Sequence, residues 1–332
     1  MAPGSSSRIS IRESAARVWR ESVGWAAASA AAVARNWRRC IFRLLYRYSR
    51  LQGWNDNLLR VKSLLDALRD DHSKVTLDIA ALELASIEFP GLDNEAFTFR
   101  LDNLAEQIDA QLTPAANGLD FVKASNEYLF EVMQFRGNAE EYYDPRNSCL
   151  NSVLMRRLGI PITLSLVYME VARRLSRTVY GVGLPGHFIV AYEDSGSRYW
   201  IDPFHSGQIL SFADLCTLAK DAVGMDLRLN PAVLAPVTKR QILVRMLSNL
   251  KAIYMRGEAF DKARQVLDLL IQAMPEYAEE YRHRGLVHLR QLNHKAAKAD
   301  LETYLRLEPD SPEREQVEKQ LVLIERWKAG LN

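Results

Sequence analysis

The sequence predicts an α+β core, a helical layer with a small antiparallel sheet, followed by an all-α tail built from repeats. Three observations predict this architecture. Residues 56–135 carry apolar side chains at helical spacing. Residues 178–202 contain three short runs rich in β-branched and aromatic residues. Beyond residue 238 the chain repeats with a period of 34 residues, which is typical of stacked helical pairs.

The composition bounds the class of protein. The chain has 332 residues, 48% of them hydrophobic, which is enough for a substantial core. Its length favours two domains. Its net charge of +2 is uneven, because residues 1–50 hold ten Arg and only two acidic residues, which leaves the rest at −6. Nucleic-acid binding by the folded part is therefore not expected. Cys40, Cys149 and Cys216 show no paired spacing, so we predict no disulfide framework, no metal site and no cofactor.

Residues 1–54 form a basic extension before the core. It is rich in Arg, Ser and Ala and poor in acids, as in a transit peptide, so we expect an organelle such as a mitochondrion or plastid, or the cytoplasm if it is not a transit peptide. A disordered basic tail and a helix lying on a membrane surface are the alternatives. Its apolar stretch is about a dozen residues, whereas a span needs about 20, so no transmembrane segment is predicted.

Four amphipathic helices are predicted at the start of the core, residues 55–230. Apolar spacing places them at 56–70, 77–85, from about 94 to 108, and 121–135. Asp93 or Asn94 is expected to cap the third helix. This segment therefore reads as an all-helical layer.

A short helix at 148–158 and a buried one at 162–175 are expected next. Pro161 opens the second, because proline is favoured in the first helical turn. Strands follow at 178–182, 187–192 and 198–202, and the last two are joined by a turn at 194–197.

Residues 231–238 read as a Pro-punctuated linker, and residues 239–332 as the repeat tail. Several positions recur after 34 residues, including Pro275 with Pro309 and Ala263 with Ala297. This is the tetratricopeptide pattern of helical pairs with small residues where helices cross. Two repeats and a final helix at 313–327 are few for a freestanding solenoid, so we expect the tail to dock on the core.

His187 and Asp202 are the candidate catalytic residues. Each lies in a strand-like run after a predicted helix, which is the order of papain-type and transglutaminase-type sites. An Asp on the adjacent strand fixes the tautomer of the imidazole and makes its other nitrogen a usable base. A satisfied core histidine and an Asp-Pro turn are the alternatives. His205 is expected at the rim of the same cleft.

The nucleophile is the weak part of this pattern. A reactive Cys belongs at the start of the buried helix, where the helix dipole lowers its pKa, but that place holds Pro161-Ile162-Thr163. Cys149 lies one helix earlier on an apolar face. It is interpreted either as a small buried hydrophobe or as a displaced nucleophile.

A second group of candidate binding residues precedes Cys149. Asp144, Arg146 and Asn147 have two interpretations. One is a helix start, with Asn147 or Ser148 as the cap and Asp144 paired with Arg146; in the other, Arg146 and Asn147 donate hydrogen bonds into the cleft of His187. Trp200 either lines that cleft or fills the core.

Five longer runs of residues form the basis of a family resemblance: Phe135-Arg136-Gly137-Asn138, Tyr142-Tyr143-Asp144-Pro145-Arg146-Asn147-Ser148, Arg157-Leu158-Gly159-Ile160-Pro161-Ile162-Thr163-Leu164-Ser165, Gly183-Leu184-Pro185-Gly186-His187-Phe188 and Ile201-Asp202-Pro203-Phe204. On the basis of these runs, roughly residues 56–330 closely resemble the bacterial SirB-type transglutaminase-like proteins, which pair such a core with a tetratricopeptide tail. The resemblance implies a cysteine-proteinase-like α+β fold, with His187 and Asp202 at the transglutaminase His and Asp positions. It places the usual Cys at Pro161 or Ile162.

Three functions follow as hypotheses. The first is a transglutaminase-fold protein that has lost acyl transfer and binds a protein or peptide through its cleft and tail. The second is a thiol-dependent hydrolase or acyltransferase acting on peptide amide bonds with Cys149, His187 and Asp202. The third is a regulatory or assembly role of the tail alone. The sequence does not determine the oligomeric state or the partner.

Overall fold

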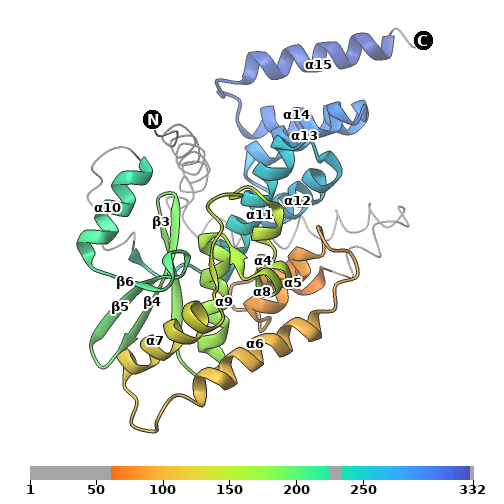
Figure 1. The fold of residues 1–332 in the computed structure, drawn as a ribbon. Helices are drawn as coiled ribbons and strands as arrows, with labels where there is room; N and C mark the ends of the chain where they lie inside the picture. Colours follow the sequence, from red (N-terminus) through yellow and green to blue (C-terminus); the bar gives the residue numbers. More distant parts are fainter. Residues whose placement is uncertain (1–60, 224–233, 330–332) are drawn as a thin grey trace, which may run out of the picture.

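The computed structural model of the chain describes residues 61–223 and 234–329. It shows a helical layer, a four-stranded sheet and a tail of paired helices (Figure 1). The predicted basic extension at residues 1–54, Cys40 and the first part of the predicted linker lie outside the described residues.

The helical layer comprises α4 (Lys62–Arg69), α5 (Leu77–Ala85), α6 (Asn94–Asp109) and α7 (Gly118–Asn126). Asp93 caps α6 by accepting hydrogen bonds from the backbone N–H groups of Glu95 and Ala96. The prediction of four helices is thus confirmed, but the fourth does not run to residue 135 as an α-helix. It changes at Glu127 to a π-helical segment, Glu127–Val132, a form often found at functional sites.

Two short segments separate this layer from the central helix. The 3-10 helix Pro145–Ser148 is followed by α8 (Leu150–Arg156), which ends when Arg157 adopts a left-handed conformation with φ 59°. The predicted helix through residue 158 was therefore too long. Leu158–Gly159 (β2) instead pairs in parallel with Arg136–Gly137 (β1), a contact that helical spacing cannot indicate.

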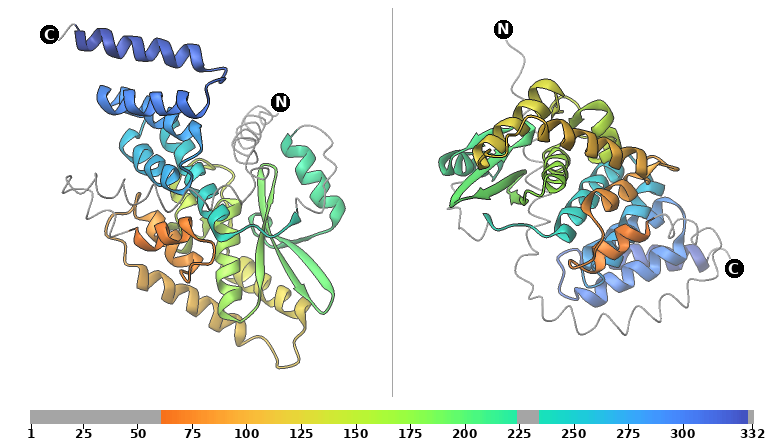
Figure 2. Two further views of the ribbon diagram at one scale, coloured as in Figure 1. Left: turned by 180° about the vertical axis from the view of Figure 1, so that it is seen from behind. Right: turned by 90° about the horizontal axis from the view of Figure 1, so that it is seen from below.

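The central helix α9 (Pro161–Arg174) packs against one face of the sheet (Figures 1 and 2). The strands are β3 (Val179–Leu184), β4 (His187–Asp194), β5 (Ser197–Asp202) and β6 (Gln208–Leu210), all antiparallel in sequential order. Three of them were predicted; β6, only three residues long, was not. In β4, Phe188 and Val190 face the large core with α9, while Ile189 and Ala191 face a smaller cluster beside α10 (Phe212–Val223).

The tail contains α11 (Lys239–Arg256), α12 (Phe260–Ala273), α13 (Ala278–Arg290), α14 (His294–Leu307) and α15 (Arg314–Ala329). The small residue expected at the helix crossing is Gly285. A Cβ at this position would lie 2.9 Å from a methyl carbon of Leu301, so α13 and α14 approach too closely there for a larger residue.

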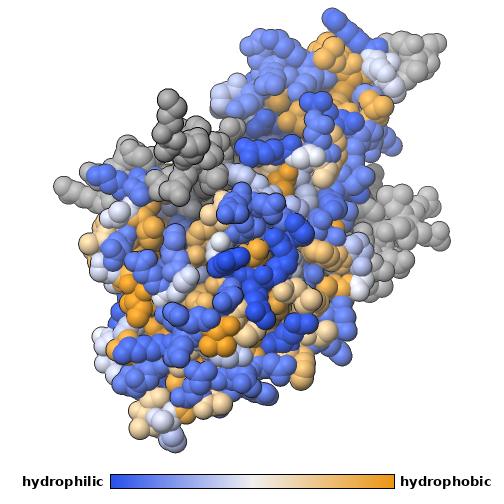
Figure 3. Space-filling view, in the orientation of Figure 1, coloured by the Kyte–Doolittle hydropathy of each residue, from blue (hydrophilic) through white to orange (hydrophobic). Residues whose placement is uncertain are grey.

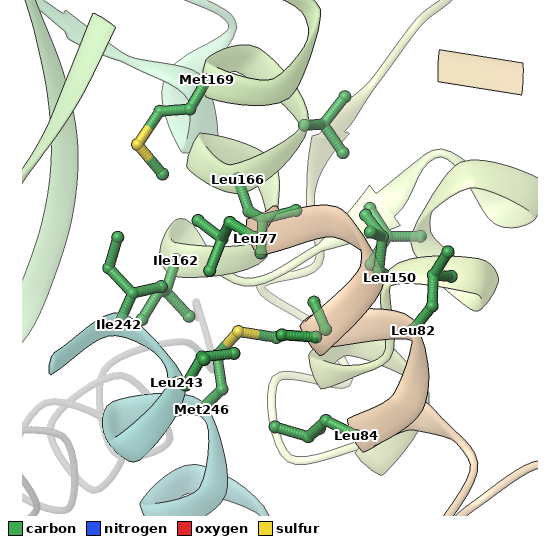
Figure 4. Packing of buried hydrophobic residues seen from close by; sticks show 14 of the residues in the cluster. Leu77, Leu82, Leu84, Leu150, Ile162, Leu166, Met169, Ile242, Leu243 and Met246 are labelled. Carbon is green, nitrogen blue, oxygen red and sulfur yellow. The ribbon is translucent and has the colours of Figure 1, made fainter. Parts of the chain in front are cut away.

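The first helix of the tail is part of the core. Ile242, Leu243 and Met246 of α11 lie in the same buried cluster as residues of α5 and α9, and these helices converge in Figure 4. The linker also pairs with the sheet, because the Val237 N–H donates to the Gly181 carbonyl at 2.9 Å. The expectation that the tail docks on the core is confirmed.

The second repeat behaves differently. Helices α13 to α15 extend away from the core in Figures 1 and 2. Except for Val287 of α13, which lies in the large core, their buried hydrophobic residues form a separate cluster around Leu301 and Tyr304. Among the helices of the described segments, none combines the length and hydropathy that crossing a bilayer requires.

Candidate functional site

His187 and Asp202 meet at one end of the sheet. A two-residue turn with Gly186 at φ 65° joins β3 to β4 and places His187 at the first position of β4. Asp202 ends the neighbouring strand β5. The Nε2 atom of His187 lies 2.7 Å from the Oδ2 atom of Asp202, so the predicted pairing of imidazole and carboxylate is confirmed.

His205 reaches the same carboxylate oxygen. It lies on the 3-10 helix Pro203–His205, and its Nδ1 atom is 2.7 Å from Asp202 Oδ2. It is therefore a direct partner of Asp202, and its side chain, 51% exposed, also lies at the edge of the site as expected. The spacing of three residues between Asp202 and His205, within one helical turn, was the signal that the sequence interpretation missed.

Backbone groups orient the Asp202 carboxylate. Its Oδ1 atom accepts hydrogen bonds from the N–H groups of Phe204 at 3.0 Å and His205 at 3.3 Å, which leaves Oδ2 directed at the two imidazoles. Asp202 is 1% exposed. Burial alone would raise its pKa, but the hydrogen bonds from His187 and His205 hold the pKa of this carboxyl well below its ordinary value. The same interaction raises the pKa of His205.

Two glycines allow the Pro203–His205 turn to pack closely. A Cβ at Gly137 of β1 would lie 2.5 Å from two ring carbons of Phe204. A Cβ at Gly207 would lie 2.5 Å from the Phe130 ring of the π-helical segment. The Nδ2 group of Asn126 also donates to the Gly207 carbonyl at 2.6 Å. Bulk at either glycine would displace the turn that carries His205.

Arg245 connects the tail to this site. Its Nη2 group donates to the backbone carbonyl of His187 at 2.7 Å, and its guanidinium lies 5.3 Å from the centre of the Phe188 ring. Because Arg245 belongs to α11, the position of His187 depends on a residue of the tail.

Cys149 is not in this cluster. Its side chain is fully buried before α8, and its Sγ atom contacts the Pro145 carbonyl at 3.4 Å. Burial raises the pKa of the thiol, and the charges of Glu88 and Asp144 raise it further. In the part of the chain that the structure describes, the group of His, Cys and acidic side chains that converge within 4.8 Å at this site is His187, Asp202 and His205.

The start of α9 carries no nucleophilic sulfur. Pro161 and Ile162 occupy it, and the Thr163 hydroxyl donates to the Asn147 carbonyl at 2.7 Å. Thr163 and Ile162 are buried. The position that the resemblance assigns to the nucleophile is therefore filled by residues that pack the fold.

The candidates before Cys149 have partners within the chain. Asp144 caps the 3-10 helix and pairs with Arg146 at 2.7 Å, and this pairing was expected in one of the two interpretations. The cap expected at Asn147 or Ser148 was wrong, because the N-cap of α8 is Cys149, which makes no capping side-chain hydrogen bond. Asn147 is fully buried, and its Nδ2 group donates to the Glu141 carbonyl at 2.6 Å. Arg146 and Asn147 thus take part in contacts that hold the turn before α8.

Trp200 packs on the other side of the sheet. It contacts the smaller cluster beside α10, which includes Ile189, Ala191 and Leu215. Of the two interpretations given for Trp200, the structure shows the packing one.

Comparison with known proteins agrees with this architecture. Residues 95–248 match the model of the transglutaminase-like superfamily, and residues 250–322 match a tetratricopeptide repeat. A UPF0162 protein of Xylella fastidiosa (strain Temecula1) is 36% identical over 256 residues, which are 76% of this chain and 91% of the relative. A UPF0162 protein of Vibrio cholerae is 26% identical over 259 residues, 78% of this chain and 96% of the relative.

A more distant similarity extends to a human protein. F-box only protein 21 of Homo sapiens is 29% identical over 167 residues, which are 47% of this chain and 26% of that protein. The resemblance to proteins with a transglutaminase-like core and a tetratricopeptide tail is confirmed. With the fold, the His187–Asp202 pair and these matches together, the chain belongs to the UPF0162 family.

Proposed function

We propose that this protein binds a protein or peptide partner and does not perform thiol-dependent acyl transfer. The observation that carries the proposal is that the chain has no accessible cysteine at the position of a nucleophile. The start of α9 holds Pro161 and Ile162, and Cys149 is fully buried away from the imidazole cluster. A thiol nucleophile needs access to substrate and a lowered pKa, and burial raises the pKa of Cys149 instead.

The His187–Asp202 pair is the feature that favours the alternative, a thiol-dependent hydrolase or acyltransferase with Cys149 as nucleophile. Proton transfer requires the sulfur and the imidazole within hydrogen-bond reach, about 3 Å. The Sγ atom of Cys149 instead contacts the Pro145 carbonyl, and the charges that affect its pKa are those of Glu88, Asp144 and Lys262. The non-catalytic interpretation is therefore the better supported of the two.

A thiol-labelling experiment decides between them. In a Cys40→Ser, Cys216→Ser variant, Cys149 is the sole thiol, and we expect iodoacetamide to label it only after denaturation. The His187→Ala change on the same background is the matched comparison. Labelling of the native protein that disappears with His187→Ala would establish an activated nucleophile and overturn the proposal.

The tail supports the binding half of the proposal. Tetratricopeptide repeats are protein-interaction modules, and the last helix α15 exposes Val322, Leu323 and Trp327. Figure 3 shows hydrophobic patches within the otherwise hydrophilic surface of this protruding part. Large exposed apolar groups are typical of interaction surfaces.

A displayed peptide library selected on the full chain tests this half. We expect selected peptides to lose affinity for the Leu323→Asp variant and to keep it for Phe99→Asp, a comparably exposed apolar residue on α6. Failure to select any peptide, or peptides insensitive to Leu323→Asp, would argue against a partner site on the tail.

We also propose that residues 1–54 are a transit peptide that directs the protein to an organelle. Their ten Arg and lack of acidic residues beyond Glu13 and Glu21 support this. Sequencing the N-terminus of the native protein tests it, because an intact Met1 or Ala2 would exclude cleavage.

A further inference from the structure

The cluster of His187, Asp202 and His205 contains one more imidazole than a proton-transfer pair requires. An Asp orients a catalytic His with a single hydrogen bond. Here Asp202 Oδ2 faces His187 Nε2 and His205 Nδ1, both at 2.7 Å. The second imidazole therefore needs an explanation of its own.

We propose that His187, Asp202 and His205 form a binding site for a divalent transition-metal ion such as Zn²⁺. The inference goes beyond the proposed function and does not depend on it. Two imidazoles and one carboxylate are a donor set suited to zinc and to other late first-row metals, and three protein ligands leave coordination positions open. The three donor atoms lie within 4.8 Å of one another.

The surroundings of the cluster resemble the support that metal sites require. Ligating carboxylates are held by further hydrogen bonds that fix their orientation. Asp202 has this support, because Oδ1 accepts the N–H groups of Phe204 and His205 and only Oδ2 faces the imidazoles. The Arg245 hydrogen bond to the His187 carbonyl fixes the backbone of a second ligand.

The ion has a route to the site and needs only a small adjustment. The side chain of His205 is 51% exposed and that of His187 is 11% exposed, whereas Asp202 is buried. With zinc bonds of about 2.0–2.1 Å, a tetrahedral site has donor atoms about 3.3 Å apart. The donor pairs are now at hydrogen-bond distance, 2.7 Å, so each imidazole would retreat by roughly half an ångström. Rotation of the half-exposed His205 ring provides much of this movement.

The site is made by tertiary structure and not by a local motif. His187 comes from the start of β4, Asp202 from the end of β5 and His205 from the following turn. Because the cysteines form no closely spaced motif, their spacing predicts no metal site. The arrangement of Asp202 and His205 three residues apart, facing a histidine fifteen residues earlier, replaces such a motif.

Isothermal titration with Zn²⁺ tests the proposal on the full chain after removal of metals with a chelator. We expect one Zn²⁺ per chain. Loss of a supporting residue around a metal costs about 10- to 100-fold in affinity, so loss of a ligand in His205→Ala should cost at least about tenfold. The matched control is His72→Ala, because His72 is exposed and lies outside the cluster.

A second readout separates binding at this site from binding elsewhere. Co²⁺ in place of Zn²⁺ gives visible absorption bands that report imidazole coordination, and these bands should disappear in His205→Ala and Asp202→Asn. Near-UV circular dichroism checks that the variants are folded. If Asp202→Asn does not fold, His205→Ala decides, since its side chain is half exposed.

Three results would overturn the proposal. One is the absence of Zn²⁺ binding by the folded wild-type chain. Another is binding that His205→Ala leaves unchanged. The third is an equal loss in His205→Ala and His72→Ala, which would indicate adventitious histidine binding.

Discussion

Replacing Gly137 by alanine should destabilise the protein through Phe204. The added Cβ would lie 2.5 Å from two carbons of the Phe204 ring and 2.7 Å from a third. Carbon atoms in proteins pack at about 3.5–4.0 Å, so the ring must move by about 1 Å or the β1 backbone must shift. Overpacking of this kind costs about 1–3 kcal/mol. We expect a loss of that size in the free energy of unfolding.

Urea denaturation followed by circular dichroism measures this loss. The matched control is Gly257→Ala, where the added Cβ meets only the Ile253 carbonyl at 3.4 Å. That change should be neutral or stabilising by about 0.4–1 kcal/mol, because alanine restricts the unfolded chain. Phe204→Leu in the Gly137→Ala background should recover part of the loss. Equal stabilities of Gly137→Ala and Gly257→Ala would refute the steric argument.

Three further predictions concern charge and packing. Arg284 bridges Asp268 and Asp300 at 2.8 and 2.7 Å. Arg284→Met should cost about 3–5 kcal/mol, because Asp300 loses this buried partner and Asp268 keeps only Arg264 among the described residues. Lys298→Ala, which removes an exposed ion pair with Glu325, should change the stability much less; thermal and urea unfolding measure both. Burial raises the pKa of Asp78, but hydrogen bonds from Thr76 and Arg174 outweigh it and lower the pKa below the ordinary value. The ionised carboxylate therefore stabilises the fold above the unfolded-state pKa of about 3.9, and this stabilisation is lost as the pH falls below that value. The difference in unfolding free energy between wild type and Asp78→Asn should become smaller at that low pH, and a constant difference would contradict the assignment. Leu243→Ala in the shared core should cost about 2–5 kcal/mol, and the exposed Leu323→Ala should stay within about 0.5 kcal/mol; similar losses would mean that α11 is not part of the core.

The sequence was most informative where periodicity and local chemistry agree. Helices α5, α6 and α9 and strands β3 to β5 were predicted from apolar spacing, caps and β-branched runs. Segments defined by distant partners were missed. The β1 strand is two residues long and exists because Arg136 and Gly137 pair with Leu158 and Gly159, so no local pattern marks it.

The same division holds within the site. The pairing of His187 with Asp202 followed from two adjacent predicted strands, and the structure shows it at 2.7 Å. The position of His205 depends on the Pro203–His205 turn, which brings its imidazole to Asp202. This turn packs closely against neighbouring segments because Gly137 and Gly207 have no side chains there. Such room is a property of packing between distant segments, which spacing along one sequence does not contain.

The hydrogen bond from Arg245 to the His187 carbonyl has a consequence for how the two halves of the molecule move. Because α11 packs in the core and also binds the backbone of His187 through Arg245, it cannot move independently of the core. A partner that displaces the protruding repeats would therefore also act on α11. Through Arg245, a shift of α11 would change the position of the His187 backbone next to the turn at Gly186.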